Sequence, residues 1–187
     1  PEENDIFPTS NLDLPGYDFV YVVKPMEEAF RPGHFKGMSQ VVKRLLDIVH
    51  PVYLFMGQKD YQQFKIVEKM IQITKSKVKL VMCPTLRERN GLAMSSRNER
   101  LSHSTREKAG IIYTTLKAIK KSKGNKTIKE LEQYGLKRLS IAPFEPEYVS
   151  IVDGHKLTSL NDINDTDYAV VCVAVWADGV RLIDNII

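Results

Sequence analysis

The chain has 187 residues, 43% of them hydrophobic and 27% charged, a composition that is typical of globular proteins and excludes a disordered chain. No apolar run approaches the roughly 20 residues that a membrane-spanning helix needs, so we expect no membrane partner. The net charge is +4, and its densest part is a lysine series with no interleaved aromatic side chains to stack on bases. We therefore favour a solvated helix face over a nucleic-acid site for Lys117, Lys120, Lys121, Lys123, Lys126 and Lys129.

The first half of the chain alternates strand-like and helix-like segments joined by short links. This order predicts an α/β fold with a parallel, doubly wound sheet, here part of a Rossmann-like nucleotide-binding domain over residues 1–84. The expected elements are a loop (1–19), a strand (20–23), an irregular connection (26–35), a helix (37–50), a strand (52–56), a helix (60–73) and a strand (78–82). The inward faces expected for the two helices comprise Met38, Val41, Val42, Leu45, Leu46 and Val49, then Phe64, Val67, Met70 and Ile71.

In the second half, two helices precede three strands. Ser104 with Glu107, and Thr127 with Glu130, have the spacing of capping boxes and predict two helix starts. Asp178-Gly179 predicts a hairpin between the last two strands. We therefore expect a small α+β lid domain with an antiparallel meander over residues 85–187. Its helices are expected to bury Ala109, Ile112, Leu116, Ile119, Leu131, Leu136 and Leu139, and its strands to span residues 148–152, 168–175 and 180–183.

The turn after the strand at residues 52–56 has the features of an anion site. Gly57 allows a ligand to approach the backbone closely, and the N–H groups at the start of the next helix favour an anion. Lys59 supplies a mobile positive charge suited to phosphate. Ligands of doubly wound sheets bind at the carboxyl ends of strands, where this turn falls. The alternative is an ordinary strand–helix turn with an exposed lysine.

A second polar element is Gly91-Leu92-Ala93-Met94-Ser95-Ser96-Arg97-Asn98. Two adjacent hydroxyls and a guanidinium are the groups that a polyphosphate clamp needs. Ser95 and Ser96 can donate to phosphate oxygens, and Arg97 can neutralise the charge that develops on leaving pyrophosphate. The alternative is a polar loop in which the serines stabilise turns and the arginine is solvated.

These elements, with two further motifs, resemble those of the pantothenate synthetase (pantoate–β-alanine ligase) family. Gly57-Gln58-Lys59-Asp60-Tyr61-Gln62-Gln63 resembles the family's G-E-K-D-Y/F-Q-Q element. Pro84-Thr85-Leu86-Arg87-Glu88, with the segment 91–98, resembles its P-T/I-x-R-x and D-G-L-A-M/L-S-S-R-N loop. Arg31-Pro32-Gly33-His34-Phe35 and Arg181-Leu182-Ile183-Asp184-Asn185 resemble its R-P-G-H-F and R-L-I-D-N segments. The motifs occur in the family's order over nearly the whole chain.

The resemblance implies an ATP-dependent ligase of the nucleotidylyltransferase superfamily that forms pantoyl adenylate, releases pyrophosphate and transfers the acyl group to β-alanine. It also implies a homodimer, and Mg²⁺ that phosphate oxygens and water hold rather than a protein cage. By the same resemblance, Gln63 would bind pantoate and the backbone of Leu86 would meet adenine. Gly57, Gln58, Lys59 and Asp60 would contact ATP, with Lys59 on the phosphates, and Met94, Ser95, Ser96 and Arg97 would close on the triphosphate.

Two positions depart from the family pattern: Gln58 stands where the family has Glu, and Asn90 where it has Asp. We expect a modest effect on binding from each. The family's upstream M-G-x-L-H-x-G-H segment and the upstream glutamine that helps hold pantoate have no counterpart here, and the four histidines present cannot replace the histidine that stabilises the adenylate. The opening residues 1–5 resemble the interior of a longer sequence, so we expect a C-terminal portion of the enzyme that is inactive by itself.

Two other functions fit the same phosphate elements. A different nucleotidylyltransferase would not need Gln62-Gln63 or the R-L-I-D-N end. A non-catalytic nucleotide-binding or interaction module would bind ATP or self-associate without forming an adenylate. Cys83 and Cys172 give neither a disulfide framework nor a metal motif, so we expect the reducing environment of the cytoplasm.

Overall fold

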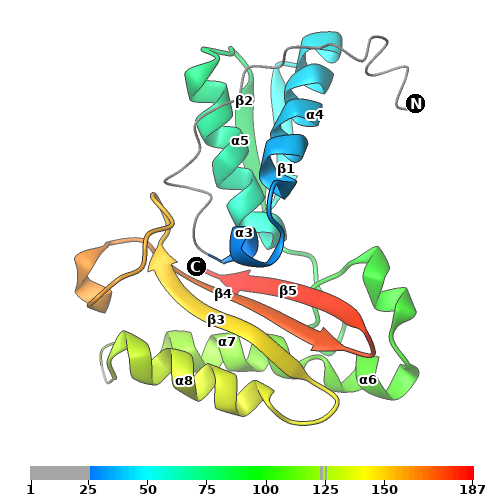
Figure 1. The fold of residues 1–187 in the computed structure, drawn as a ribbon, viewed down its shortest axis with the longest axis vertical. Coiled ribbons are helices and arrows are strands. Elements are labelled where there is room, and N and C mark those ends of the chain that lie inside the picture. The colour runs from blue at the N-terminus through cyan, green and yellow to red at the C-terminus, as the bar shows by residue number, and fades with distance from the viewer. Residues whose placement is uncertain (1–25, 123, 125) are drawn as a thin grey trace. The chain divides into compact units, whose positions relative to one another are not determined.

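The structure, a computed structural model, describes residues 26–122, 124 and 126–187 (Figure 1). The expected loop over residues 1–19 and strand over residues 20–23 lie outside these residues. The chain divides into two compact units. One is formed by the described residues up to Met56 with Gln62–Cys83, and the other by Gly57–Tyr61 with the described part of Pro84–Ile187. The second unit is therefore discontinuous in sequence, because a short segment from the middle of the first belongs to it.

The first unit is built around a parallel two-stranded sheet. Its elements are α3 (Glu27–Phe30), α4 (His34–Val49), β1 (Tyr53–Gly57), α5 (Tyr61–Ile73) and β2 (Lys79–Cys83). The helices and strands expected after residue 36 are confirmed within a few residues. The expectation of irregular chain over residues 26–35 is wrong, because α3 occupies part of it and α4 begins directly after Gly33, whose φ of 76° is left-handed.

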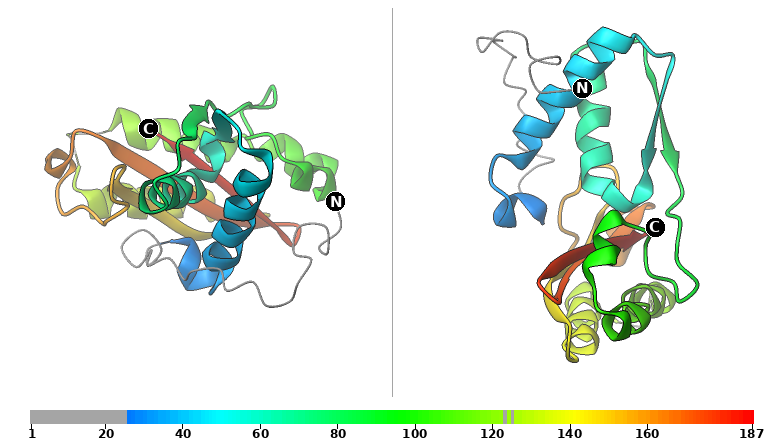
Figure 2. Two further views of the ribbon diagram at one scale, coloured as in Figure 1. Left: turned by 90° about the horizontal axis from the view of Figure 1, so that it is seen from above. Right: turned by 90° about the vertical axis from the view of Figure 1, so that its right-hand side faces the viewer.

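The core of the first unit lies between its helices and one face of the sheet (Figure 2, right). Phe35 of α4 and three residues of α5 are buried together, and Leu54 and Met56 of β1 pack against them. The α5 residues are Ile66, Val67 and Met70. The opposite face of β1 carries Tyr53 and Phe55, which are exposed.

The apolar face predicted for α4 is too wide. Met38, Val42 and Leu46, spaced by four residues, pack against the core of the first unit. Val41, Leu45 and Val49 are instead 40%, 39% and 65% exposed, because they lie on the neighbouring line of the helix surface. The sequence pattern shows only that the stripe is apolar, whereas α5 and the sheet cover one side of it.

The second unit is an α+β arrangement in which α7 (Ile111–Lys121) and α8 (Ile128–Leu139) lie on one face of an antiparallel sheet (Figure 1). The sheet order is β3-β4-β5. Asp178 and Gly179 have φ angles of 50° and 70°, so the predicted hairpin between β4 and β5 is confirmed with the geometry of a type I′ turn. The strands are Glu145–Asp153, Ala169–Ala177 and Val180–Ile186, and the shorter elements are η1 (Gln58–Asp60), η2 (Ser96–Arg100), α6 (His103–Lys108) and η3 (Ile163–Asp165). The expected fold class is thereby confirmed.

The helices of the second unit bury the residues that the sequence predicts. Leu136 is partly buried, and the other six are at most 1% exposed, namely Ala109, Ile112, Leu116, Ile119, Leu131 and Leu139. The capping box at the start of α8 is also confirmed. Thr127 Oγ1 accepts from the Glu130 N–H at 3.3 Å, and the Glu130 carboxylate accepts from the Thr127 N–H at 2.8 Å.

The helix expected to begin at Ser104 differs from the prediction. Ser102 is the N-cap of α6, because its hydroxyl oxygen accepts from the Thr105 N–H at 3.3 Å. The helix then breaks before α7 at Gly110, where a Cβ would lie 2.2 Å from the carbonyl oxygen of Asn90. The Asn90 side-chain amide donates to the carbonyl oxygens of Arg106 and Glu107 at 2.7 and 3.1 Å and so satisfies the end of α6.

Candidate functional site

Residues 57–60, which we call the Lys59 turn, connect β1 to α5 through η1. Gly57 has an extended backbone, and a Cβ there would meet no atom within 4 Å. The glycine therefore leaves open space beside the turn rather than meeting a conformational need. Gln58, Lys59 and Asp60 are half-buried. Helix α5 follows η1 directly, so the turn stands at the positive end of the helix dipole.

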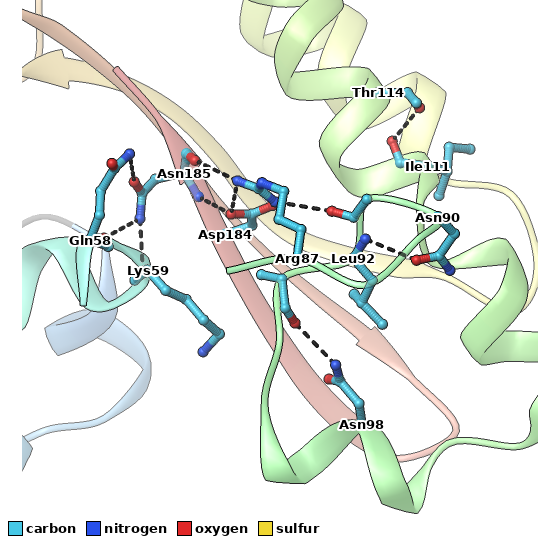
Figure 3. A network of polar contacts seen from close by, with 12 residues as sticks. Gln58, Lys59, Arg87, Asn90, Leu92, Asn98, Ile111, Thr114, Asp184 and Asn185 are labelled. Atoms are coloured by element: carbon cyan, nitrogen blue, oxygen red, sulfur yellow. Dashed lines mark hydrogen bonds and ion pairs between the residues drawn. The ribbon is translucent and has the colours of Figure 1, made fainter. Parts of the chain in front are cut away.

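The last strand of the second unit holds the Lys59 turn (Figure 3). The side-chain amide of Asn185, near the end of β5, donates to the carbonyl oxygens of Gln58 and Lys59, both at 2.8 Å. Its Oδ1 accepts from Gln58 Nε2 at 3.1 Å. Tyr61 adds a second anchor, since its buried hydroxyl donates to the carbonyl oxygen of Gly154 at 2.7 Å. These bonds explain why Gly57–Tyr61 belongs to the second unit.

Arg87 ties the loop of residues 86–97, which we call the polar loop, to the same strand (Figure 3). Its guanidinium donates to both carboxylate oxygens of Asp184, at 2.6 and 3.0 Å, and to the Gly91 carbonyl oxygen at 3.1 Å. The guanidinium carbon also lies 3.7 Å from the centre of the Tyr113 ring. Asp184 is 3% exposed, so this is a bidentate ion pair largely removed from water.

Two opposing influences act on the carboxyl group of Asp184. Burial raises its pKa above the ordinary value, whereas the hydrogen bonds from Arg87 and the positive charge of Lys59 act in the other direction. With these side chains ionised, the Lys59 turn is neutral, because Asp60 offsets Lys59. The polar loop carries a charge of +2 from Arg87, Glu88, Arg89 and Arg97, so that with Asp184 the two elements keep one net positive charge, the sign that an anionic ligand requires.

Backbone hydrogen bonds fold the polar loop back on itself. The Met94 N–H donates to the Leu86 carbonyl oxygen at 2.9 Å, and the Glu88 N–H donates to the Leu92 carbonyl oxygen at 2.8 Å. A carbonyl oxygen can accept two bonds, so that of Leu86 can accept a further bond from a ligand. The side chains of Leu86 and Met94 are 75% and 55% exposed.

The hydroxyl and guanidinium groups of the expected clamp lie at the start of η2. Ser95 Oγ accepts from the Arg97 N–H at 3.2 Å, the local contact that the alternative interpretation describes, while its own hydrogen can still be donated. Ser96 and Arg97 are exposed. Buried Asn98 supports this segment by donating to the Ala93 carbonyl oxygen at 3.0 Å (Figure 3) and to Glu88 Oε1 at 2.7 Å.

The structure places nine of the ten predicted site residues in the second unit and one, half-buried Gln63, in the first. The nine are Gly57, Gln58, Lys59, Asp60, Leu86, Met94, Ser95, Ser96 and Arg97. The link between the Lys59 turn and the polar loop runs through Arg87, Asp184 and Asn185, to which the sequence interpretation assigns no role. All three residues occur in the motifs that resemble the family's, but a motif does not show which residues its side chains contact.

Within the described parts of the chain, no three or more His, Cys, Asp or Glu side chains gather into a group that could hold a metal ion. The helices that the structure describes include none with the length and apolarity to cross a membrane.

A family model described as Pantoate-beta-alanine ligase matches residues 1–187. The chain belongs to this family. Two curated relatives named Pantothenate synthetase, from Azobacteroides pseudotrichonymphae genomovar. CFP2 and from Bacteroides thetaiotaomicron, are 41% and 38% identical over 187 residues. Each match covers 100% of this chain and 66% of the relative, so the chain spans just under two thirds of the length of these pantoate-beta-alanine ligases.

Solved structures of the pantoate-beta-alanine ligase family share the fold. The pantothenate synthetase of Thermus thermophilus matches with a TM-score of 0.91 and 35% identity, over 100% of this chain and 67% of that one. The enzyme of Francisella tularensis, complexed with beta-gamma ATP and beta-alanine, matches with a TM-score of 0.73 and 31% identity, over 100% and 62%. The family that the motifs predict is therefore confirmed.

Proposed function

We propose that the chain carries the ATP-phosphate and pantoate contacts of a ligase that condenses pantoate with β-alanine to give pantothenate, AMP and pyrophosphate. The observation that carries the proposal is that the Lys59 turn and the polar loop belong to one compact unit in a member of the pantoate-beta-alanine ligase family. The Francisella tularensis relative, complexed with beta-gamma ATP and beta-alanine, supports the choice of substrates.

In the proposed first step, a carboxylate oxygen of pantoate attacks the α-phosphorus of ATP, forming pantoyl adenylate and releasing pyrophosphate. Lys59 stabilises the charge that develops on the phosphate oxygens, and the positive dipole end of α5 adds to this. Ser95, Ser96 and Arg97 bind the departing phosphates, and Met94 closes over them. In the second step the β-alanine amine attacks the acyl carbon, and AMP leaves.

The remaining proposed contacts select the substrates. Gln63 donates to pantoate, backbone groups of Leu86 meet adenine, and Gly57, Gln58 and Asp60 complete the nucleotide contacts. Mg²⁺ would supply charge neutralisation and would be held mainly by phosphate oxygens and water. The single carboxylate of Asp60 in the Lys59 turn fits an ion that the substrate, rather than the protein, holds.

Calorimetric titration with ATP and Mg²⁺ tests the phosphate contact. Lys59→Ala should weaken binding about tenfold to hundredfold, the loss expected when a charged hydrogen-bond donor is removed. Lys129→Ala removes an exposed lysine of α8 in the same unit and should leave the affinity unchanged. Equal affinities of the Lys59 variant and the unaltered chain would rule out the phosphate contact.

A pantoate titration separates the ligase from its alternatives. A non-catalytic nucleotide-binding module and a different nucleotidylyltransferase would both bind ATP with the same dependence on Lys59, yet neither needs pantoate. We expect pantoate binding that Gln63→Ala weakens and that Gln72→Ala, an exposed residue of the same helix, does not. Binding of ATP without pantoate would favour the alternatives.

We further propose a nucleotide-binding domain over residues 1–84, a lid domain over residues 85–187, a homodimer and a cytoplasmic location. Sedimentation equilibrium tests the dimer. Inactivity of these 187 residues alone also stays a prediction: a steady-state assay should detect no pantothenate, and full turnover would contradict it.

A further inference from the structure

Asn185 uses every hydrogen-bonding group of its side chain on the Lys59 turn. Its two amide hydrogens go to the carbonyl oxygens of Gln58 and Lys59, and its oxygen accepts from the Gln58 side chain. The residue is 1% exposed, so water cannot replace these partners easily. Rotating the amide by half a turn would set its oxygen against two carbonyl oxygens, so the network fixes one orientation.

This contact also sets the direction of the backbone donors in the turn. In a trans peptide, the carbonyl group of one residue and the N–H of the next point in opposite directions. Because the Gln58 and Lys59 carbonyls point at Asn185, the N–H groups of Lys59 and Asp60 point away from it. Asn185 therefore fixes two amide donors together with the base of the Lys59 side chain.

Asp184 holds the polar loop in a corresponding way, through Arg87. Its carboxylate accepts both Arg87 bonds and also the N–H of Asn185 at 2.8 Å. Arg87 in turn lies next to Leu86, bonds to Gly91 and stacks on Tyr113. Two consecutive residues of β5 thus reach both phosphate elements, one through each side chain.

We propose that Asn185 and Asp184 are positioning residues of the phosphate site: Asn185 orients the Lys59 turn, and Asp184, through Arg87, orients the polar loop toward the same ligand. This inference rests on the proposed function in taking phosphate as the ligand of Lys59, whereas the anchoring of the turn does not. The competing explanation is that both residues stabilise the second unit and nothing more.

The binding test compares ATP–Mg²⁺ with adenosine, which lacks phosphates, at a temperature where every variant is folded. Asn185→Ala should weaken ATP–Mg²⁺ binding roughly tenfold to hundredfold, as small displacements of binding groups do, and leave adenosine binding unchanged. In a Lys59→Ala background the same substitution should have a smaller effect on ATP, because only the backbone donors of the turn then remain for Asn185 to orient. Equal losses for ATP and adenosine, or no loss for either, would overturn the role of Asn185.

The matched control is Glu147→Ala, which removes a contact of the same sheet far from the Lys59 turn in the strand register. Glu147 accepts from Trp176 Nε1 and from Arg181 Nε, both at 2.9 Å. We expect the control to lower the melting temperature without changing either affinity. Should Asn185→Ala fail to fold, Asn185→Ser keeps one donor for the two carbonyls and should give a smaller loss of the same kind.

Nuclear magnetic resonance gives a readout that does not depend on ATP. The ¹H–¹⁵N heteronuclear Overhauser effects of Lys59 and Asp60 should fall in Asn185→Ala and stay unchanged in Glu147→Ala. Arg87→Lys keeps the charge but loses the bidentate geometry. It should lower these values in the polar loop while sparing the Lys59 turn.

The binding test and the relaxation test together separate the positioning inference from the proposed function on which it rests. If the unaltered chain does not bind ATP, or binds it without Lys59, the proposed function fails and the relaxation data still decide the anchoring. If Lys59 matters but Asn185→Ala leaves both the affinity and the relaxation unchanged, the positioning inference fails and the proposed function stands.

Discussion

The two units differ in how completely they bury their apolar side chains. In the second unit, β4 is buried along almost its whole length, and its helices close a core of nineteen buried residues. Among the described residues of the first unit the corresponding cluster has four, and Val49, Val52 and Phe55 are each more than 60% exposed. Lys59 follows a strand of the first unit, yet the hydrogen bonds from Asn185 hold its turn to the second unit, whose core is the better buried among the described residues.

The largest expected effect comes from matched leucine truncations in the two units. Leu131→Ala, in the core of the second unit, should lower the free energy of unfolding by about 3 kcal/mol. Leu45→Ala, on the exposed side of α4, should change the free energy of unfolding by less than about 0.5 kcal/mol. Urea unfolding followed by fluorescence of Trp176, in β4, measures the first, and hydrogen exchange of α4 measures the second. Similar losses at both sites would show that the contrast in burial does not govern stability.

Two glycine substitutions should change the free energy of unfolding in opposite directions. Gly110→Ala places a Cβ 2.2 Å from the Asn90 carbonyl oxygen and should cost the second unit about 2 kcal/mol. Gly37→Ala, inside α4 with no atom within 4 Å of the new Cβ, should stabilise the first unit by about 0.5 to 1 kcal/mol. Urea unfolding of both variants measures the two changes in stability. A Gly110→Ala variant with unchanged stability would disprove the close packing of Gly110 against Asn90.

Asn90→Asp should destabilise the second unit by about 1 kcal/mol, because a carboxylate cannot donate to the Arg106 and Glu107 carbonyls. Asn90→Ala separates the causes, since it removes the donors without adding charge. ATP affinity should change only modestly in both variants, as the departure from the family pattern at this position implies, and titration calorimetry checks this. A gain in stability from aspartate would mean that this end of α6 is satisfied in another way.

The smallest expected effect is on the pH dependence of stability, to which two carboxylates of the second unit contribute in opposite directions. Burial raises the pKa of Glu132 above its ordinary 4.5, so its contribution favours folding below that pH and is lost as the pH rises through the raised value. The hydrogen bond from Arg106 lowers the pKa of Glu88, so its contribution is present at neutral pH and lost as the pH falls through the lowered value.

At neutral pH, Glu132→Gln should therefore be more stable than the unaltered chain, because glutamine can still accept from the Ile151 N–H. Glu88→Gln should be less stable. The Glu132 difference should shrink as the pH falls through the raised pKa of Glu132, and the Glu88 difference as the pH falls through the lowered pKa of Glu88. Urea unfolding over a series of pH values, followed by the fluorescence of Trp176, checks the signs. Two stability differences of the same sign at neutral pH would contradict the assignment.

The elements of the second unit could be predicted from local signals. The Thr127–Glu130 capping box, the Asp178-Gly179 turn and the inward faces of α7 and α8 are each encoded within a few residues. The break at Gly110 could not be predicted, because its cause is a carbonyl twenty residues earlier in the chain. The width of the buried face of α4 likewise depends on which elements cover it, which periodicity does not reveal.

The candidate site shows the same limit. Lys59, Ser95, Ser96 and Arg97 were identified from chemistry that a ligand would need, together with the family resemblance, and their ligand contacts stay predictions. Asn185 and Asp184 lie more than 80 residues from the groups that they hold. Since no local pattern records such a pairing, only the folded chain shows that β5 joins the two elements.

The discontinuity of the second unit has a practical consequence for dissecting this protein. A piece cut at residue 84 would contain every strand and long helix of that unit yet lack Gly57–Tyr61. The amide of Asn185 and the carbonyl of Gly154 would then face solvent in place of their partners. An autonomous C-terminal module would need those five residues restored as a separate peptide or through a circular permutation. The reason is that a single cut in the sequence separates two segments that belong to one compact unit.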